Sequence, residues 1–172
     1  MDLDIRPVRP GEYAALGELT VAAYLGLGDL ELGGYADELR NVADRATRAH
    51  VLVAVSGDRL LGGVTYVAGP DLPYAEELRP GEVGIRMLAV DPAAQGLGVG
   101  RALVEAVLAR ARRDGARAVA LHSTPVMRAA HRLYENLGFR RSPSRDLDLP
   151  DVALLSFELD LEPGRDAPGG RT

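Results

Sequence analysis

The chain has 172 residues, a hydrophobic content of 47%, which is enough for one domain with a real core, and a net charge of −5. A general nucleic-acid binder would carry a basic excess, so the acidic balance argues against that class of protein. The sequence contains no cysteine, which excludes disulfides, thiolate metal sites and a cysteine acyl-enzyme within it.

Periodicity in the first part of the chain predicts one strand and then two helices. Residues 3–8 alternate between apolar and polar side chains, as a half-buried strand does. Apolar residues recur at helical spacing over residues 13–24 and again over residues 35–46. The glycine-punctuated stretch 25–34 is therefore expected to be a connection between two helices.

The next segment predicts an antiparallel hairpin followed by a long loop. Residues 51–55 and 60–67 read as strands, and the turn residues Ser56 to Arg59 lie between them. Residues 69–81 contain three prolines and exceed the usual length of a hairpin connection. A substrate-facing lid and a plain surface insertion are both compatible with this loop.

A strand, a glycine-rich turn and a helix follow over residues 83–113. The turn, residues 95–100, has glycines at alternate positions, which leave its backbone N–H groups open where a helix N-terminus carries partial positive charge. Such a turn can hold a phosphate group. A P-loop would end in Gly-Lys-Ser or Gly-Lys-Thr, where this chain has Gly100-Arg101-Ala102, and the spacing of the glycines does not fit a Rossmann turn.

The last part of the chain predicts a strand, a helix and two more strands. Residues 118–123 form a short strand that should run parallel to the strand before the glycine turn, because a helix connects the two. A threonine and a proline open the helix 124–137. Another strand begins at Phe139, residues 143–150 are expected to be irregular, and residues 152–159 form the final strand.

The order of these elements predicts a mixed α/β (α+β) fold, with a central sheet flanked by helices. We expect one domain over residues 1–161 and a disordered tail over residues 162–172. No apolar run approaches the roughly 20 residues of a membrane span. The acidic start, Met1 to Asp4, is unlike a signal peptide, so a cytoplasmic protein without a membrane partner is expected. The three histidines show no metal-ligand spacing, and no metal site is expected.

Two motifs and the order of elements resemble the GNAT N-acetyltransferase family along essentially the whole chain. The pattern Gln-x-x-Gly-x-Gly at Gln95, Gly98 and Gly100 resembles the acetyl-CoA-binding motif of that family, and residues 130–139 resemble its other recurrent segment. The resemblance implies a GNAT fold and acetyl-CoA as the cofactor. It implies that the coenzyme is held by Leu88, Ala89, Val90, Gln95, Gly96, Leu97, Gly98, Val99, Gly100 and Arg101.

The resemblance also assigns catalytic roles. Tyr134 would lie near the coenzyme sulfur and protonate the leaving thiolate, although it also falls on the apolar stripe and fits a core tyrosine. Glu82 is the leading general base, although the family often has a glutamate where this chain has Gly84. Glu82 would then act through a water, and a solvated residue at the start of its strand is the alternative. His122, at the end of its strand, is a second candidate base. Met127 stands where relatives often have asparagine, which is a further departure from the pattern.

The sequence says least about the acceptor substrate. In the resembled family the segment between the first two helices often lines the acceptor cleft, so Tyr24 and Tyr35 are candidate substrate-binding residues. Arg86 could meet a carboxylate on the acceptor or pair with Glu82. The leading hypothesis is acetyl transfer from acetyl-CoA to a primary amine of a small molecule or peptide, by direct attack in a ternary complex.

Two alternatives stay open. The first is a catalytically silent acyl-CoA sensor on the same fold, and the second is a nucleotide-binding module with a similar glycine turn. A homodimer is also compatible with the resemblance, because dimers are common in the family.

Overall fold

A mixed sheet of eight strands organises the chain in the computed structural model, which describes residues 2–27, 32–75, 77–150 and 152–161. The strands are β1 (Asp4–Pro7), β2 (His50–Ser56), β3 (Arg59–Val67), β4 (Glu82–Val90), β5 (Ala118–Ser123), β6 (Arg140–Arg141), β7 (Leu147–Leu149) and β8 (Val152–Asp160). The helices are α1 (Tyr13–Leu25), α2 (Tyr35–Arg40), α3 (Val42–Arg48), α4 (Val99–Arg113) and α5 (Arg128–Asn136), with short 3₁₀ turns η1 (Pro10–Glu12), η2 (Pro92–Ala94) and η3 (Pro143–Arg145).

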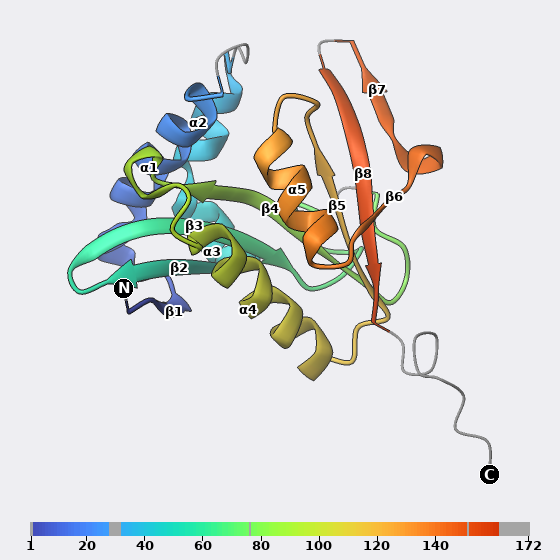
Figure 1. Ribbon diagram of the computed structural model, residues 1–172, viewed down its shortest axis with the longest axis horizontal. Coiled ribbons are helices and arrows are strands. Elements are labelled where there is room, and N and C mark those ends of the chain that lie inside the picture. Colours follow the sequence, from blue (N-terminus) through green and yellow to red (C-terminus); the bar gives the residue numbers. More distant parts are fainter. Residues whose placement is uncertain (1, 28–31, 76, 151, 162–172) are drawn as a thin grey trace.

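The strands lie in the order β1-β2-β3-β4-β5-β8-β6, and β7 pairs with β8 outside this path (Figure 1). Only β4 and β5 run parallel; the other pairs are antiparallel. The parallel pair is joined through α4, as the sequence predicts for a strand-helix-strand crossover. The predicted fold class, a mixed sheet flanked by helices, is confirmed.

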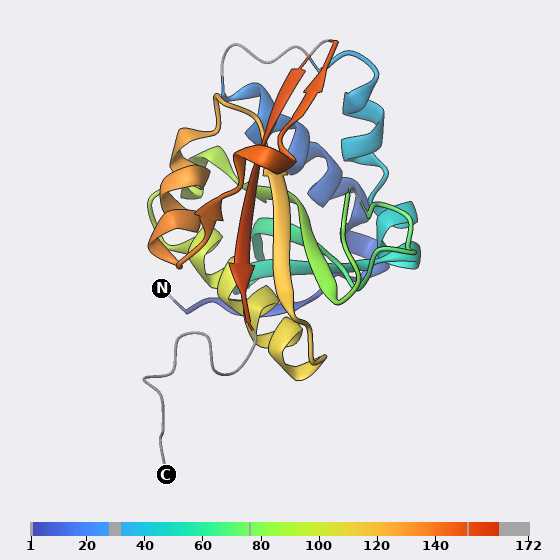
Figure 2. The same cartoon turned by 90° about the vertical axis from the view of Figure 1, so that its right-hand side faces the viewer.

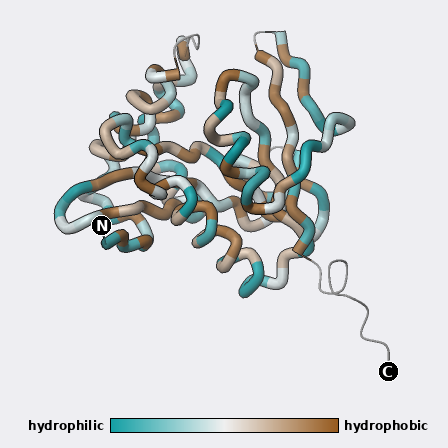
Figure 3. Tube along the Cα trace, in the orientation of Figure 1, coloured by the Kyte–Doolittle hydropathy of each residue, from teal (hydrophilic) through white to brown (hydrophobic). Residues whose placement is uncertain are grey.

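Helices cover both faces of the sheet (Figures 1 and 2). The first face packs against α4 and α5 through a large core that includes Val83, Ile85 and Leu103. The second face packs against α1, α2 and α3 through two smaller clusters, in which Met87 and Leu39 are buried. Apolar residues are concentrated along the central strands (Figure 3), since burial of apolar area is the main favourable contribution to folding.

The structure corrects three sequence predictions. The helix predicted over residues 35–46 is two helices, because Asn41 leaves helical geometry and its side chain accepts a hydrogen bond from the backbone N–H of Asp44 (3.3 Å). Helix α5 begins at Arg128 and not at Thr124, whose hydroxyl is buried without a hydrogen-bond partner in the described part of the chain. The irregular segment 143–150 contains β7, which forms a short ladder with β8. The predicted tail, 162–172, lies outside the described residues.

Candidate active site

Strands β4 and β5 separate partway along their length. They pair only from Glu82 with Ala118 to Gly84 with Ala120, although β4 continues to Val90 and β5 to Ser123. Figure 1 shows the two strands diverging beyond this point. The separation leaves backbone N–H and C=O groups of both strands without ladder partners, and such groups are available to bind an extended ligand as an added strand would.

A bulge in β4 changes the face of the sheet on which the side chains beside this opening lie. Met87 has a φ of +53°, and the register between β3 and β4 shifts by one residue between Gly63 and Thr65. The extra residue puts Met87 and Ala89 in the core beneath α1 and α2, while Leu88 and Val90 contact the core beneath α4. A non-glycine residue in the left-handed region costs about 1–2 kcal/mol, and such strain often lies at functional sites.

The glycine-rich turn connects the end of β4 to α4. Gly96 and Gly98 have φ values of +80° and +84°, which side chains with a Cβ adopt only with strain, so the backbone path itself requires glycine. Helix α4 begins at Val99, and the N–H groups of its first turn have no carbonyl partner within the helix. A Cβ added at Gly100 would lie 3.4 Å from Leu133 of α5, which is an ordinary van der Waals contact, so this position has room for a small side chain.

A cavity of about 580 Å³ opens beside the turn. Nine of the ten residues predicted to hold the coenzyme line it, namely Leu88, Ala89, Val90, Gln95, Gly96, Gly98, Val99, Gly100 and Arg101. The tenth, Leu97, is not among the lining residues, and 57% of its surface is exposed. The predicted coenzyme residues are therefore gathered around one volume.

Sequence reasoning missed the walls that α1 and α5 contribute to this cavity. They are Ala23, Gly26 and Leu27 on one side and Val126, Met127, Arg128, Ala129, Ala130 and Leu133 on the other, with Ala94 of η2 near the turn. The helical spacing of Ala130 and Leu133 predicted a buried face, and no local signal showed that this face borders a cavity. Met127 lines the cavity where relatives often have asparagine, so its contact there is apolar.

The two tyrosines of greatest interest are both buried. Tyr24 lines the cavity, and burial raises the pKa of its hydroxyl, with further contributions from the nearby Tyr35 and Tyr134. Tyr134 is 4% exposed, does not line the cavity, and packs against Phe139 and Phe157 with ring centroids 5.5 and 5.8 Å apart. Burial also raises the pKa of Tyr134 above its usual value near 10, so this hydroxyl stays protonated at neutral pH.

Glu82 lies at the opposite end of β4 from the glycine turn, and its carboxylate is fully engaged. The side chain is 2% exposed and takes two hydrogen bonds from the guanidinium of Arg145, at 2.8 and 2.9 Å. It also accepts the backbone N–H of Arg79 at 2.8 Å, and Arg117 lies 3.7 Å away. Burial by itself raises the pKa of Glu82, but these bonds and charges outweigh it and lower the pKa. This environment stabilises the carboxylate and disfavours proton uptake.

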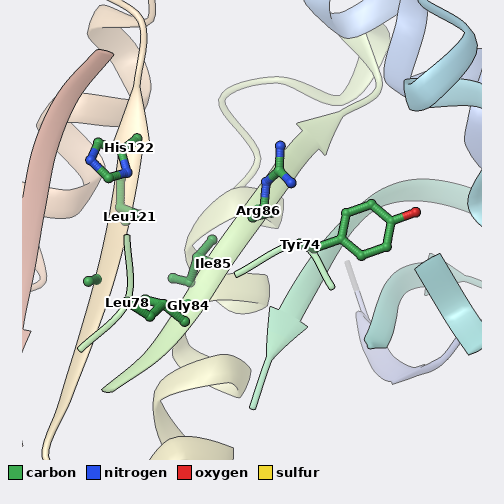
Figure 4. Close-up of a pocket in the computed structure, with 8 residues that line it drawn as sticks. Tyr74, Leu78, Gly84, Ile85, Arg86, Leu121 and His122 are labelled. Carbon is green, nitrogen blue, oxygen red and sulfur yellow. The ribbon is translucent and has the colours of Figure 1, made fainter. Parts of the chain in front are cut away.

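A second, small cavity lies on the face of the sheet opposite α4, where β4 and β5 begin to separate (Figure 4). It is lined by Tyr74, Leu78, Gly84, Ile85, Arg86, Ala120, Leu121 and His122. Arg86 lies over the ring of Tyr74 at 5.7 Å, and the Tyr74 hydroxyl donates a hydrogen bond to Asp44. The loop 69–81 therefore supplies two walls of this cavity.

The predicted substrate residues divide between the two cavities. Tyr24 borders the large cavity and Arg86 the small one. Tyr35 lines neither, but its ring centroid lies 6.3 Å from that of Tyr24. His122, the second candidate base, faces the small cavity, and its Nε2 lies 3.1 Å from the carbonyl oxygen of Arg145.

None of the helices in the described part of the chain is long and apolar enough to cross a membrane. No group of three or more histidine, cysteine, aspartate or glutamate side chains in the same residues could hold a metal ion.

Comparison with known proteins identifies the family. A mycothiol acetyltransferase of Geodermatophilus obscurus is 44% identical over 96 residues, which are 54% of this chain and 29% of that protein. An N-acetylaspartate synthetase of Danio rerio is 42% identical over 77 residues, 44% of this chain and 27% of that protein. The matches thus span less than a third of these curated relatives.

A GNAT family acetyltransferase from Brucella melitensis, solved in complex with acetyl-CoA, superposes with a TM-score of 0.61 at 23% identity. The superposition covers 94% of this chain and 92% of the other. Residues 17–139 match the acetyltransferase (GNAT) family. This match takes in the divergent β4 and β5 strands, the glycine turn and α5, and the chain therefore belongs to the acetyltransferase (GNAT) family.

Proposed function

We propose that the protein is an acetyl-CoA-dependent N-acetyltransferase that acts on a primary amine. The observation that carries this proposal is the large cavity, because it joins the open N-terminus of α4 to the unpaired edge of β4. The first feature suits a pyrophosphate and the second an extended pantetheine arm. Membership of the family and the acetyl-CoA complex of the Brucella relative support the same cofactor.

The glycine turn would hold the pyrophosphate of the coenzyme. Gln95, Gly96 and the residues from Gly98 to Arg101 line this end of the cavity. A helix N-terminus contributes about 0.3–1 kcal/mol to binding of an anion, and up to about 2 kcal/mol when partly buried. The guanidinium of Arg101 pairs with Glu105 at 2.9 Å on an exposed surface. Such pairs are weak, so the cation can turn toward a phosphate.

The unpaired edge of β4 would orient and polarise the thioester. Backbone N–H groups around Leu88 and Ala89 border the cavity, and one well-aimed donor to a developing oxyanion is worth about 3–4 kcal/mol. The chain has no cysteine to form an acyl-enzyme, so we propose direct attack of the amine on the bound thioester. The C–N bond forms, the C–S bond breaks, and the amine loses a proton.

Tyr134 is the proposed acid for the leaving thiolate. Its raised pKa guarantees a proton at neutral pH, which suits an acid more than a base. The same rise weakens the driving force for proton transfer, since the usual pKa of a thiol is about 8.5. This balance predicts a contribution of about 10²-fold in rate, which is the lower end of the range for a general acid.

A catalytically silent acyl-CoA-binding domain is the alternative. It is favoured by the state of Glu82, whose carboxylate is occupied by Arg145, and by the lack of a carboxylate at Gly84. The two proposals share the cofactor and differ only in turnover.

Two measurements test these proposals. Acetyl-CoA at 100 times its dissociation constant should stabilise the protein by about 2.7 kcal/mol, which raises the melting temperature by about 5–10 °C in a chain of this size. An unchanged melting temperature would show that the cofactor is wrong. Thiol release from acetyl-CoA is then followed with ethanolamine, L-aspartate, an amino sugar and a peptide with a free N-terminus. Release with any of these amines supports the enzyme, and binding without release supports the silent domain.

A further inference from the structure

We propose that His122 is the general base of this site and that it withdraws the proton of the acceptor amine through Nδ1. The inference rests on the proposed acetyl transfer and assigns a catalytic role to one residue of the small cavity. It also assigns Glu82 a different role, as a positioning residue that acts through Arg145.

The position of His122 in the fold favours this role. The parallel pairing of β4 and β5 ends at Gly84 and Ala120, and the same register places His122 level with Arg86, two residues into the divergence. Both side chains line the small cavity, one from each strand (Figure 4). Leu88, which borders the large cavity, lies only two residues further along β4, or about 7 Å at the usual rise of a strand.

The hydrogen bond of His122 fixes which ring nitrogen is basic. A backbone carbonyl can only accept a hydrogen bond, so the contact of 3.1 Å between Nε2 and the oxygen of Arg145 requires a proton on Nε2. In the neutral ring Nδ1 then carries the free lone pair. The contact with Arg145 is the one hydrogen bond that the described residues make to this ring.

The carbonyl that sets this tautomer is held firmly in place. The guanidinium of Arg145 is 7% exposed and donates to Glu82, to Glu158 at 2.8 Å and to the carbonyl of Glu77 at 2.8 Å. These bonds tie η3 to the start of β4 and to β8. Glu82 thus contributes to the orientation of His122 through Arg145, without contact with the acceptor.

Strand β4 leaves little room for another basic side chain near His122. A Cβ added at Gly84 would lie 3.3 and 3.5 Å from the two methyl carbons of Leu78, so this leucine already fills the space over Gly84. The loop 69–81 therefore packs an apolar side chain where the family often has a glutamate. His122 is the group with a free lone pair that the structure places beside this space.

The small cavity is suited to one relay water. Its volume is about 10 Å³, which is roughly the room that a single water requires. Charged and titratable residues lie near His122 on several neighbouring elements: Arg86 on β4, Tyr74 in the loop before it, and Arg145 and Asp146 in the segment of η3.

The proton transfers balance. The amine nitrogen forms the new C–N bond, and its proton passes through the water to Nδ1 as the C–S bond breaks. The thiolate takes a proton from Tyr134. After release of the products, His122 returns its proton to solvent and Tyr134 recovers one, so the enzyme is restored.

The first experiment determines the tautomer of His122 and does not require catalytic turnover. Nitrogen NMR of protein labelled with ¹⁵N in histidine distinguishes a proton on Nε2 from one on Nδ1, and the His122→Gln variant assigns the signal. We expect Nε2–H with an unprotonated Nδ1 at pH 8. A proton on Nδ1 would overturn the proposal.

The second experiment measures kcat/KM at pH 8, with acetyl-CoA and ethanolamine and also with acetyl-CoA and water alone. His122→Gln retains a donor for the Arg145 carbonyl but has no basic nitrogen. It should lower the rate at least 30-fold, while the melting-temperature shift with acetyl-CoA is unchanged. His50→Gln, on the exposed start of β2, is the control and should behave as wild type.

A His122→Gln rate within threefold of wild type at pH 8 would overturn the base assignment and leave acetyl transfer intact. Failure of the wild type to bind acetyl-CoA would instead refute the proposed function.

Discussion

Glu82→Gln tests whether this carboxylate stabilises the fold or removes the proton of the acceptor. Glu82 is 2% exposed and makes a two-pronged ion pair with Arg145. Removal of one partner of a buried pair typically costs about 3–5 kcal/mol. Glu158 still holds Arg145 at 2.8 Å, and the glutamine oxygen can accept one of the two bonds, so a loss of about 2–3 kcal/mol is expected.

Urea unfolding at pH 7 measures this loss, which corresponds to a fall of about 4–12 °C in melting temperature for a chain of this size. The pKa of Glu82 is lowered in the folded state, so its stabilisation is complete above the unfolded pKa of about 4.3 and disappears as pH falls through the folded value. The difference between wild type and variant should therefore shrink below about pH 4. Glu105→Gln is the matched control, because its pair with Arg101 is half exposed and should contribute less than about 1 kcal/mol.

Turnover of folded protein gives the complementary result. As a positioning residue, Glu82 should affect kcat by less than about tenfold, whereas loss of a general base usually costs about 10²–10⁴. A variant that unfolds like wild type but loses at least 100-fold in kcat would refute this reasoning and restore Glu82 as the base.

Three further predictions concern the turn, the tyrosine and the acid range. Gly98→Ala should destabilise the protein by about 1–2 kcal/mol in urea unfolding because its φ is +84°, whereas Gly100→Ala, in the helix, should be neutral or stabilising by up to about 1 kcal/mol; equal effects would contradict this view of the turn. Tyr134→Phe should lower kcat by about 10–100-fold and by the same factor from pH 6 to 9, because the raised pKa keeps Tyr134 protonated throughout; an unchanged kcat would remove its role as the acid. The ion pair with Arg141 lowers the pKa of Asp146 to about 2, so its stabilisation is present above about pH 4 and is lost as pH falls toward 2. Asp146→Asn should therefore be less stable than wild type at pH 7 and equal to it near pH 2, and a constant difference would contradict the assignment.

The sequence by itself determined most of the order of elements and the position of the glycine-rich turn. Apolar periodicity located α1, α4 and the central strands, because a helix or strand that buries one face repeats its apolar residues with a fixed period. Gly96 and Gly98 marked the turn in the sequence for a similar reason, since a backbone with positive φ strongly favours glycine.

Local rules failed at the start of α5 and in the segment before β8. Thr124 and Pro125 have the residue types of a helix start, yet α5 begins at Arg128, after a turn in which the Met127 N–H donates to the Thr124 carbonyl. The residues before β8 looked irregular because of their prolines, but pairing with β8 makes β7 a strand.

The sequence left the base open between Glu82 and His122, and the proposed choice of His122 rests on the surroundings of the two side chains. Glu82 lies in β4, the strand that borders the large cavity, but Arg145, 63 residues away in sequence, binds its carboxylate. His122 has an ordinary strand context, and the carbonyl of the same Arg145 directs one ring nitrogen and leaves the other available. Periodicity records which side chains are buried, whereas hydrogen bonds between distant segments decide which buried group is free to react, and only the tertiary structure brings those segments together.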